Sequence, residues 1–238
     1  MSQTSLIGVG LYTLPDAARI IKVKPDTLRV WVKEARYTMR GIQYARQPVI
    51  QRALADFPNV LTFLELIELQ FIKLFRSEGV RMSVIRSAAQ RAAEMFNSDY
   101  PFAIRKFDTD GTHIFATLQQ EADSEAHIQD FSRGQLAFEH VVKPFFRKLD
   151  YRIENDNSVV LRFWPLEQEG RVVLDPARGF GRPMDAETGV PTYVLYKAAQ
   201  TGSGQTLHAV ADWYQVPVEA VKYAIRFERS LQLDFGHS

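Results

Sequence analysis

The sequence predicts a mainly helical fold with small β-hairpins, an α+β protein. Two observations carry this prediction: apolar residues recur at helical spacing near both ends of the chain, and short alternating segments flanked by turn residues lie between them. We expect a winged helix-turn-helix at the N-terminus and a second, helix-turn-helix-like pair near the C-terminus. The two pairs lie within 12–33 and 205–231.

Composition excludes several classes of protein. The 238 residues include no cysteine, which excludes disulfides, thiolate zinc sites and cysteine nucleophiles. No apolar run approaches the roughly 18 residues of a membrane span, and the first residues show no basic region followed by an apolar core. We therefore predict a cytoplasmic protein with no membrane contact.

The first pair of helices is defined by its caps. Thr13 suits an N-cap, and the four apolar residues after it give one buried face. Pro25 fits the first position of the second helix, where its missing N–H costs nothing. Two short helices joined by a tight turn, the second one basic, are typical of a motif that enters the major groove of DNA.

Charge is unevenly spread and supports the same interpretation. Residues 1–60 carry nine Lys and Arg against four Asp and Glu, although the whole chain has a net charge of only +1. Such an excess is the expected electrostatic footprint for DNA. Strands at Ile42–Arg46 and Val49–Arg52 would add a basic wing; an irregular connector with exposed arginines explains the same residues equally well.

The middle region is predicted to be helical with one hairpin. Thr62 and Glu65 form a capping box for a helix ending near Ser77, and its apolar residues wrap around more than one face. Such a helix is central to its own core or shared with another subunit, and we favour a homodimer. Further expected elements are a helix over 83–96, a hairpin over 102–118 around an Asp-Thr-Asp-Gly turn, an exposed helix or linker over 119–132, and a helix over 136–149 broken near Pro144.

The C-terminal region combines strands with a balanced helix pair. We expect a hairpin over 151–164 with its turn at 155–157, a strand over 171–174 and a helix over 191–200. The charges of the last helix are balanced, which favours a protein partner over a polyanion. Four aromatic residues would bind that partner or simply form the core of the pair: Trp213, Tyr214, Tyr223 and Phe227.

The sequence contains no recognisable catalytic constellation. The five histidines show no metal-binding spacing, and neither a nucleophile elbow nor a phosphate-binding loop is present. Asp175, Asp185 and Glu187 could hold a metal, but no pattern supports this. We therefore predict a protein that is not an enzyme and needs no cofactor or metal.

The N-terminal motif resembles that of MerR-type regulators. The matching residues are Tyr12-Thr13, Ala18-Arg19, Lys22-Val23, Thr27-Leu28-Arg29 and Trp31, with Lys22 in place of the usual turn glycine. The resemblance covers roughly the first third of the chain. It implies that Thr27 and Arg29 contact DNA backbone or bases. Phosphate contacts would be added by Lys24, Lys33, Arg36 and Arg46.

The C-terminal part resembles a small helical domain found in many VapB-like antitoxins. The matching residues are Asp175-Pro176, Gly181-Arg182-Pro183 and Thr188-Gly189-Val190-Pro191-Thr192. Together with the MerR-like start and this length, the chain is similar to the longer VapB-type antitoxins of actinobacteria. The resemblance implies a toxin partner of the PIN type, a metal-dependent ribonuclease, and repression of the shared operon.

Three functional regions follow from these observations. We predict DNA binding in 1–60, a dimerising middle region in 61–150 and toxin binding in 151–238. The predicted function is that of an antitoxin which neutralises a PIN-type toxin and binds operator DNA as a homodimer. The alternative is a MerR-like regulator whose middle region, including Phe163 and Trp164, binds a small molecule.

Overall fold

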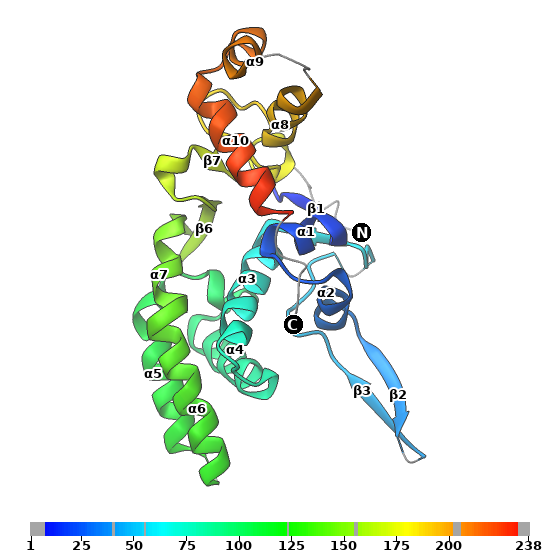
Figure 1. The fold of residues 1–238 in the computed structure, drawn as a ribbon. Helices are drawn as coiled ribbons and strands as arrows, with labels where there is room; N and C mark the ends of the chain where they lie inside the picture. Colours follow the sequence, from blue (N-terminus) through cyan, green and yellow to red (C-terminus); the bar gives the residue numbers. More distant parts are fainter. Residues whose placement is uncertain are drawn as a thin grey trace. The chain divides into compact units, whose positions relative to one another are not determined.

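The computed structural model describes residues 8–39, 41–54, 56–122, 124–154, 157–201 and 206–232. Within these ranges the protein is mainly helical with small antiparallel sheets, which confirms the predicted class (Figure 1). The chain forms two compact units. The N-terminal unit comprises Thr13–Phe146 and Tyr151–Val160, and the C-terminal unit comprises Met1–Tyr12, Arg147–Asp150 and Leu161–Ser238.

The N-terminal unit is built from helices with one long hairpin. Its helices are α1 (Leu14–Ile21), α2 (Pro25–Val32), α3 (Phe63–Ser77), α4 (Met82–Phe96), α5 (Lys106–Gln120), α6 (Glu125–Ala137) and α7 (Lys143–Phe145). Its strands are β2 (Ala35–Met39), β3 (Ile42–Arg46) and β4 (Val60–Thr62), while β1 (Leu11–Thr13) spans the boundary between the units. The β2–β3 hairpin extends away from α1 and α2 (Figure 1).

The C-terminal unit holds the remaining elements. A hairpin of β5 (Leu149–Glu154) and β6 (Asn157–Phe163) runs through both units, and the predicted turn residues 155 and 156 lie outside the described ranges. Short strands β7 (Val172–Val173) and β8 (Met184–Asp185) pair antiparallel. Helices α8 (Thr192–Thr201), α9 (Leu207–Tyr214) and α10 (Val218–Ser230) complete the unit. The predicted hairpin and helices of this region are confirmed to within a few residues.

Helix α3 is the centre of the N-terminal core. Its capping box is present, with the Glu65 N–H donating to the Thr62 hydroxyl and the Thr62 N–H donating to the Glu65 carboxylate. Phe71 in its middle packs against four other phenylalanine rings at centroid distances of 5.1 to 6.2 Å. Leu69 and Ile72, the apolar residues on its polar side, are also buried within the chain. The wide apolar surface of α3 is therefore explained without a second subunit.

The predicted hairpin over 102–118 is wrong. Residues 106–120 form α5, and the Asp-Thr-Asp-Gly segment lies inside this helix. Gly111 is required by packing, because a Cβ there would collide with the ring of Phe138. Gly134 of α6 plays the same role toward Phe115. The two glycines let large rings approach the helix backbones, and this tertiary contact outweighs the local turn signal.

The break predicted near Pro144 is confirmed. Helix α6, which begins after the Ser124 cap, passes at Phe138–Val142 into a π-helical turn. Proline has no N–H to donate to the carbonyl four residues back, so a regular α-helix cannot continue through this position. The chain then follows α7 and a 3₁₀ turn at Phe146–Lys148.

The C-terminal unit is closed by a residue from the start of the chain. Tyr12 is buried, and its hydroxyl donates to the carbonyl of Gly181 at 2.7 Å. Gly181 has φ +80°, and a Cβ at this position would collide with the Tyr12 hydroxyl. Burial raises the pKa of Tyr12, and the nearby Asp175 carboxylate raises it further. The tyrosine is therefore neutral and acts as a hydrogen-bond donor.

Candidate nucleic-acid interface

The α1–α2 pair has the capping and burial that the sequence predicts. The Asp16 N–H donates to the Thr13 hydroxyl at 3.3 Å, and Asp16 adds negative charge in the first turn of α1. All predicted inward-facing residues are buried: Leu14, Ala17, Ala18, Ile21, Leu28 and Val32. Their burial leaves one face of α2 to solvent.

The turn between these helices is tight although it contains no glycine. Lys22 adopts the left-handed conformation, with φ 57° and ψ 55°, and the Val23 N–H donates to the Ala18 carbonyl at 3.0 Å. This is the arrangement that glycine usually supplies at a helix C-terminus. A side chain in this conformation costs about 1 kcal/mol, so the lysine is tolerated at some cost in stability.

Helix α2 presents a mixed polar face. Lys24 and Arg29 are exposed, whereas Thr27 and Lys33 are half-buried. Arg29 forms an ion pair with Asp26 at 2.6 Å, and the Lys33 ammonium donates to the Asn59 side chain at 3.0 Å. Four of the six predicted DNA-binding residues thus lie on α2 or at its two ends.

Val30 is a candidate that the sequence analysis missed. Its side chain is 43% exposed, one position after Arg29 on the same face. An exposed aliphatic group on a helix that enters the major groove can contact a thymine methyl. The sequence could have identified Val30, because the helical spacing of Asp26, Arg29, Val30 and Lys33 places all four on one stripe of the helix.

The remaining two predicted residues lie on the β2–β3 hairpin. The predicted partner strand Val49–Arg52 is wrong: β3 pairs with β2, with Arg36 opposite Ala45 and Arg46 opposite Ala35. The side chains of Arg36 and Arg46 fall outside what the structure describes. The preceding segment 35–39 supplies the second strand, and Gly41, just before β3, has φ +78°, a backbone conformation that tight hairpin turns favour.

A buried ion pair fixes α2 to the core of the N-terminal unit. The Arg52 guanidinium donates to the Glu65 carboxylate at 3.1 Å, to the Val60 carbonyl at 2.6 Å and to the Val32 carbonyl at the end of α2 at 3.3 Å. The same carboxylate accepts from the N–H of Ala53. Both side chains are withdrawn from solvent, so this network sets how α2 is placed on α3.

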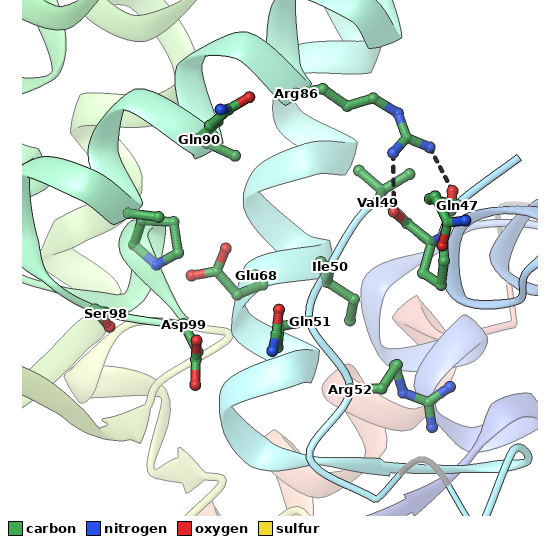
Figure 2. Close-up of a pocket in the computed structure, with 14 residues that line it drawn as sticks. Gln47, Val49, Ile50, Gln51, Arg52, Glu68, Arg86, Gln90, Ser98 and Asp99 are labelled. Carbon is green, nitrogen blue, oxygen red and sulfur yellow. Dashed lines mark hydrogen bonds between the residues drawn. The ribbon is translucent and has the colours of Figure 1, made fainter.

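The base of the hairpin is held by a second arginine. Arg86 of α4 donates to the carbonyls of Gln47 and Pro48 at 2.8 and 2.9 Å (Figure 2). The next residue, Val49, donates its N–H to the carbonyl of Trp31 in α2 at 2.7 Å. The segment that leaves β3 is therefore tied to both α2 and α4.

This segment borders a cavity of about 560 Å³, which lies between α3, α4 and residues 98–101. Figure 2 shows Glu68 from α3, with Gln51, Ser98 and Asp99 around it. Glu68 is 2% exposed, and its carboxylate accepts the N–H of Ala103 at 2.8 Å. Burial raises the pKa of Glu68 to about 8, although its backbone hydrogen bonds act in the opposite direction.

The four predicted partner-binding aromatics separate into surface and core. Trp213 is 83% exposed, and together with the half-buried Tyr214 it lines a groove of about 500 Å³ in the C-terminal unit. Tyr193 and Lys197 of α8 form the opposite side of this groove. Tyr223 is half-buried, and Phe227 is 2% exposed in a core cluster with Val172 and Leu231. The groove therefore gathers two of the four.

The acidic residues considered for a metal have other partners. Arg171 binds both Asp185 and Glu187, and Arg162 binds Asp175 at 2.9 Å. Over the ranges that the structure covers, no three His, Asp or Glu side chains group as a metal site. In the same ranges, no helix combines the length and apolar character that a membrane span requires.

Comparison with solved structures places the fold. The X-ray crystal structure of Rv2018 from Mycobacterium tuberculosis superposes with a TM-score of 0.69, covering 92% of this chain and 99% of that one at 24% identity. No family model matches the chain.

A sequence relative comes from the same organism. The protein named "Putative antitoxin VapB45" of M. tuberculosis strain H37Rv is 26% identical over 239 aligned positions. The alignment covers 91% of this chain and 93% of the relative. The similarity therefore extends through both units and is not confined to one motif.

Proposed function

We propose that this chain is the antitoxin of a toxin–antitoxin pair, which binds and neutralises a PIN-type ribonuclease and represses its own operon. The observation that carries this proposal is the similarity to a protein named as an antitoxin, extending over nine-tenths of both chains. The exposed polar face of α2 and the aromatic groove of the C-terminal unit supply separate surfaces for DNA and for a protein. Both activities fit in one cytoplasmic chain.

The DNA-binding part of the proposal rests on α2 and the β2–β3 hairpin. Helix α2 would enter the major groove in the manner of a MerR-like winged helix-turn-helix, with Thr27, Arg29 and Val30 toward the bases. Lys24, Lys33, Arg36 and Arg46 would contact phosphates. A homodimer would match a two-fold symmetric operator, and the proposal of a homodimer rests on this match in symmetry.

The test of this part is binding to the DNA upstream of the gene. Arg29→Ala should lower affinity for this duplex by about 10-fold at fixed salt, since a good contact of this kind contributes about 1–3 kcal/mol. Arg133→Ala is the matched control, because Arg133 is an exposed arginine on α6 of the same unit. Equal affinities for the two variants would refute the assignment of α2.

The toxin-binding part rests on the groove between α8 and α9. An exposed tryptophan beside two tyrosines and a lysine has the composition of an interaction hot spot. Tyr223 and Phe227 would not contact the toxin directly. They would support the groove by packing α10 against the rest of the unit. PIN-type nucleases act through acidic residues, and Lys197 would suit an acidic partner surface.

Co-purification with the product of the adjacent reading frame tests this part. Trp213→Ala should weaken the complex by at least about 2 kcal/mol, or roughly 30-fold, as expected for a central aromatic anchor. Phe180→Ala is the control, since Phe180 is exposed in the same unit but does not line the groove. A Trp213 variant that binds the toxin as tightly as the control would rule out the groove.

A second candidate function is favoured by the cavity beside Glu68. Its volume falls within the range of small-molecule sites, and it borders the segment that ties the hairpin to α2. A ligand-responsive regulator would use this cavity, whereas Phe163 is buried and the Trp164 indole is occupied by Asp150 at 2.8 Å. Native mass spectrometry of the purified chain would detect a retained small molecule; an unmodified mass would favour the antitoxin.

A further inference from the structure

The C-terminal helix pair repeats the first pair residue by residue, at a constant distance of 193 positions. Helices α1 and α9 both have eight residues and follow a threonine N-cap. Thr13 accepts the N–H of Asp16 at 3.3 Å, and Thr206 accepts the N–H of Ala209 at 3.3 Å. The two pairs therefore begin in the same way.

The two turns are also alike. Lys22 has φ 57° and ψ 55°, and its counterpart Gln215 has φ 52° and ψ 47°. The following valine then donates to the carbonyl five residues back, Val23 to Ala18 at 3.0 Å and Val216 to Ala211 at 2.9 Å. Left-handed residues other than glycine are uncommon, so this match indicates one shared backbone design.

The second helices share a central buried position and the placement of their charged residues. Leu28 corresponds to Val221, and both are fully buried. The ion pair of Asp26 with Arg29 corresponds to that of Glu219 with Lys222, at 2.6 and 3.7 Å. Lys33 corresponds to Arg226, and α10 continues for a further turn to Arg229.

In the structure, the exposed charges of α10 are not balanced, contrary to the expectation from the sequence. Glu228 is 4% exposed and accepts the Thr192 hydroxyl at 2.6 Å, so its carboxylate is not on the surface. Three cations and one carboxylate remain exposed along α10: Lys222, Arg226, Arg229 and Glu219. Their spacing of three, four and three residues places them on one face over about 15 Å, a length that fits a major groove.

We propose that α9–α10 is a second DNA-binding helix pair, with α10 in the major groove of duplex DNA and Lys222, Arg226 and Arg229 on its phosphates. The α1–α2 pair is the template for this inference, which therefore rests on the DNA-binding part of the proposed function. The aromatic groove includes no residue of α10, so a protein partner in the groove and DNA on α10 use different side chains. One chain would then contact two DNA segments.

The test compares variants on the duplex from upstream of the gene, titrated at several salt concentrations. Removing two phosphate contacts with Arg226→Ala/Arg229→Ala should lower affinity by about 10-fold or more and reduce the salt slope by about 1.8. The nuclease footprint should become shorter. Arg182→Ala, at an exposed arginine of the same unit that is not part of α10, should leave all three values unchanged.

The outcomes separate this inference from the function on which it rests. If Arg29→Ala weakens binding while the double variant keeps wild-type affinity, salt slope and footprint, the second site is refuted and the first one stands. If the double variant loses the co-purified toxin but not DNA, α10 faces an acidic protein and the inference is refuted. If the wild-type chain does not bind the duplex, DNA binding by both helix pairs is refuted. If the double variant binds more weakly but Arg29→Ala does not, DNA binding by α10 is supported and DNA binding by α2 is refuted.

Discussion

The two helix pairs share their caps and turns but differ in what holds the second helix. The end of α2 is tied by Arg52, whose partner Glu65 is a buried carboxylate on a different helix. Helix α10 is tied by its own buried carboxylate, Glu228, to the uncharged hydroxyl of Thr192. One helix geometry is thus anchored in one case by a buried ion pair and in the other by a hydrogen bond from a neutral hydroxyl to a buried carboxylate.

The difference teaches that local similarity does not fix local stability. A buried charge that loses its ionic partner is strongly destabilising, whereas a carboxylate that loses one neutral donor keeps its other contacts. We therefore expect the two pairs to respond very differently to the loss of their anchors.

The largest effect is expected at the first anchor. Arg52→Ala should lower the free energy of unfolding by about 3–5 kcal/mol, because Glu65 is left as a buried charge without its cation. Urea denaturation of this variant and of Arg133→Ala gives the comparison. A loss below about 1 kcal/mol would show that Glu65 is not dependent on Arg52.

An intermediate effect is expected from the other buried carboxylate of α3. Glu68 has a pKa raised from its ordinary value of 4.5 to about 8 by burial, so its contribution to stability is present at low pH and is lost as the pH rises through about 8. Glu68→Gln keeps an acceptor for the Ala103 N–H and cannot ionise. At about pH 9 it should be more stable than the wild type by about 2 kcal/mol or more, with little difference near pH 4.

The control for this pH profile is Glu78→Gln, at an exposed position just after α3. Its unfolding free energy should follow the wild type from pH 4 to pH 9. If Glu68→Gln also follows the wild type over this whole range, Glu68 ionises normally and the cavity is accessible to water.

A smaller effect is expected at the second anchor. Thr192→Val removes the hydroxyl that donates to Glu228 at 2.6 Å while keeping the shape of the side chain. The expected cost is about 1–2 kcal/mol, the range for a lost hydrogen bond to a buried group. Urea denaturation of this variant and of Arg52→Ala measures the difference between the two anchors directly. Equal losses in the free energy of unfolding would show that the anchors do not differ.

The smallest effect is expected at the turns, where the pairs should behave alike. Lys22→Gly and Gln215→Gly relieve left-handed backbone strain but also loosen the unfolded chain, so each should stabilise by about 0.5–1 kcal/mol. Thermal denaturation of both variants checks this. A gain at one turn and a loss at the other would contradict the equivalence of the two pairs.

Elements marked by their own caps could be predicted from the sequence. The Thr13 cap, the Thr62–Glu65 capping box and the break before Pro144 depend on neighbouring residues, and all three are present. The turn at Lys22 was predicted despite the missing glycine, because the flanking apolar spacing and Pro25 are sufficient to define two helices.

Features that depend on distant residues could not be predicted. Gly111 resembles a turn residue until the ring of Phe138 is placed against it. Glu228 counts as a surface charge until Thr192, 36 positions earlier, is found beside it. The network around Arg52 likewise joins four separate segments. The predicted functional boundaries at 60/61 and 150/151 remain predictions, since the structure divides the chain by packing rather than by function.

The position of Tyr12 has a consequence for the engineering of the chain. Its hydroxyl closes the C-terminal unit at Gly181, yet the next residue is the cap of α1. In chain order, the two segments of the N-terminal unit, Thr13–Phe146 and Tyr151–Val160, thus both interrupt the other unit, and no single cut releases the outer unit whole. Excising residues 13–146 and joining the flanking ends, rather than truncating, keeps the tyrosine with that unit and retains only Tyr151–Val160 of the N-terminal unit.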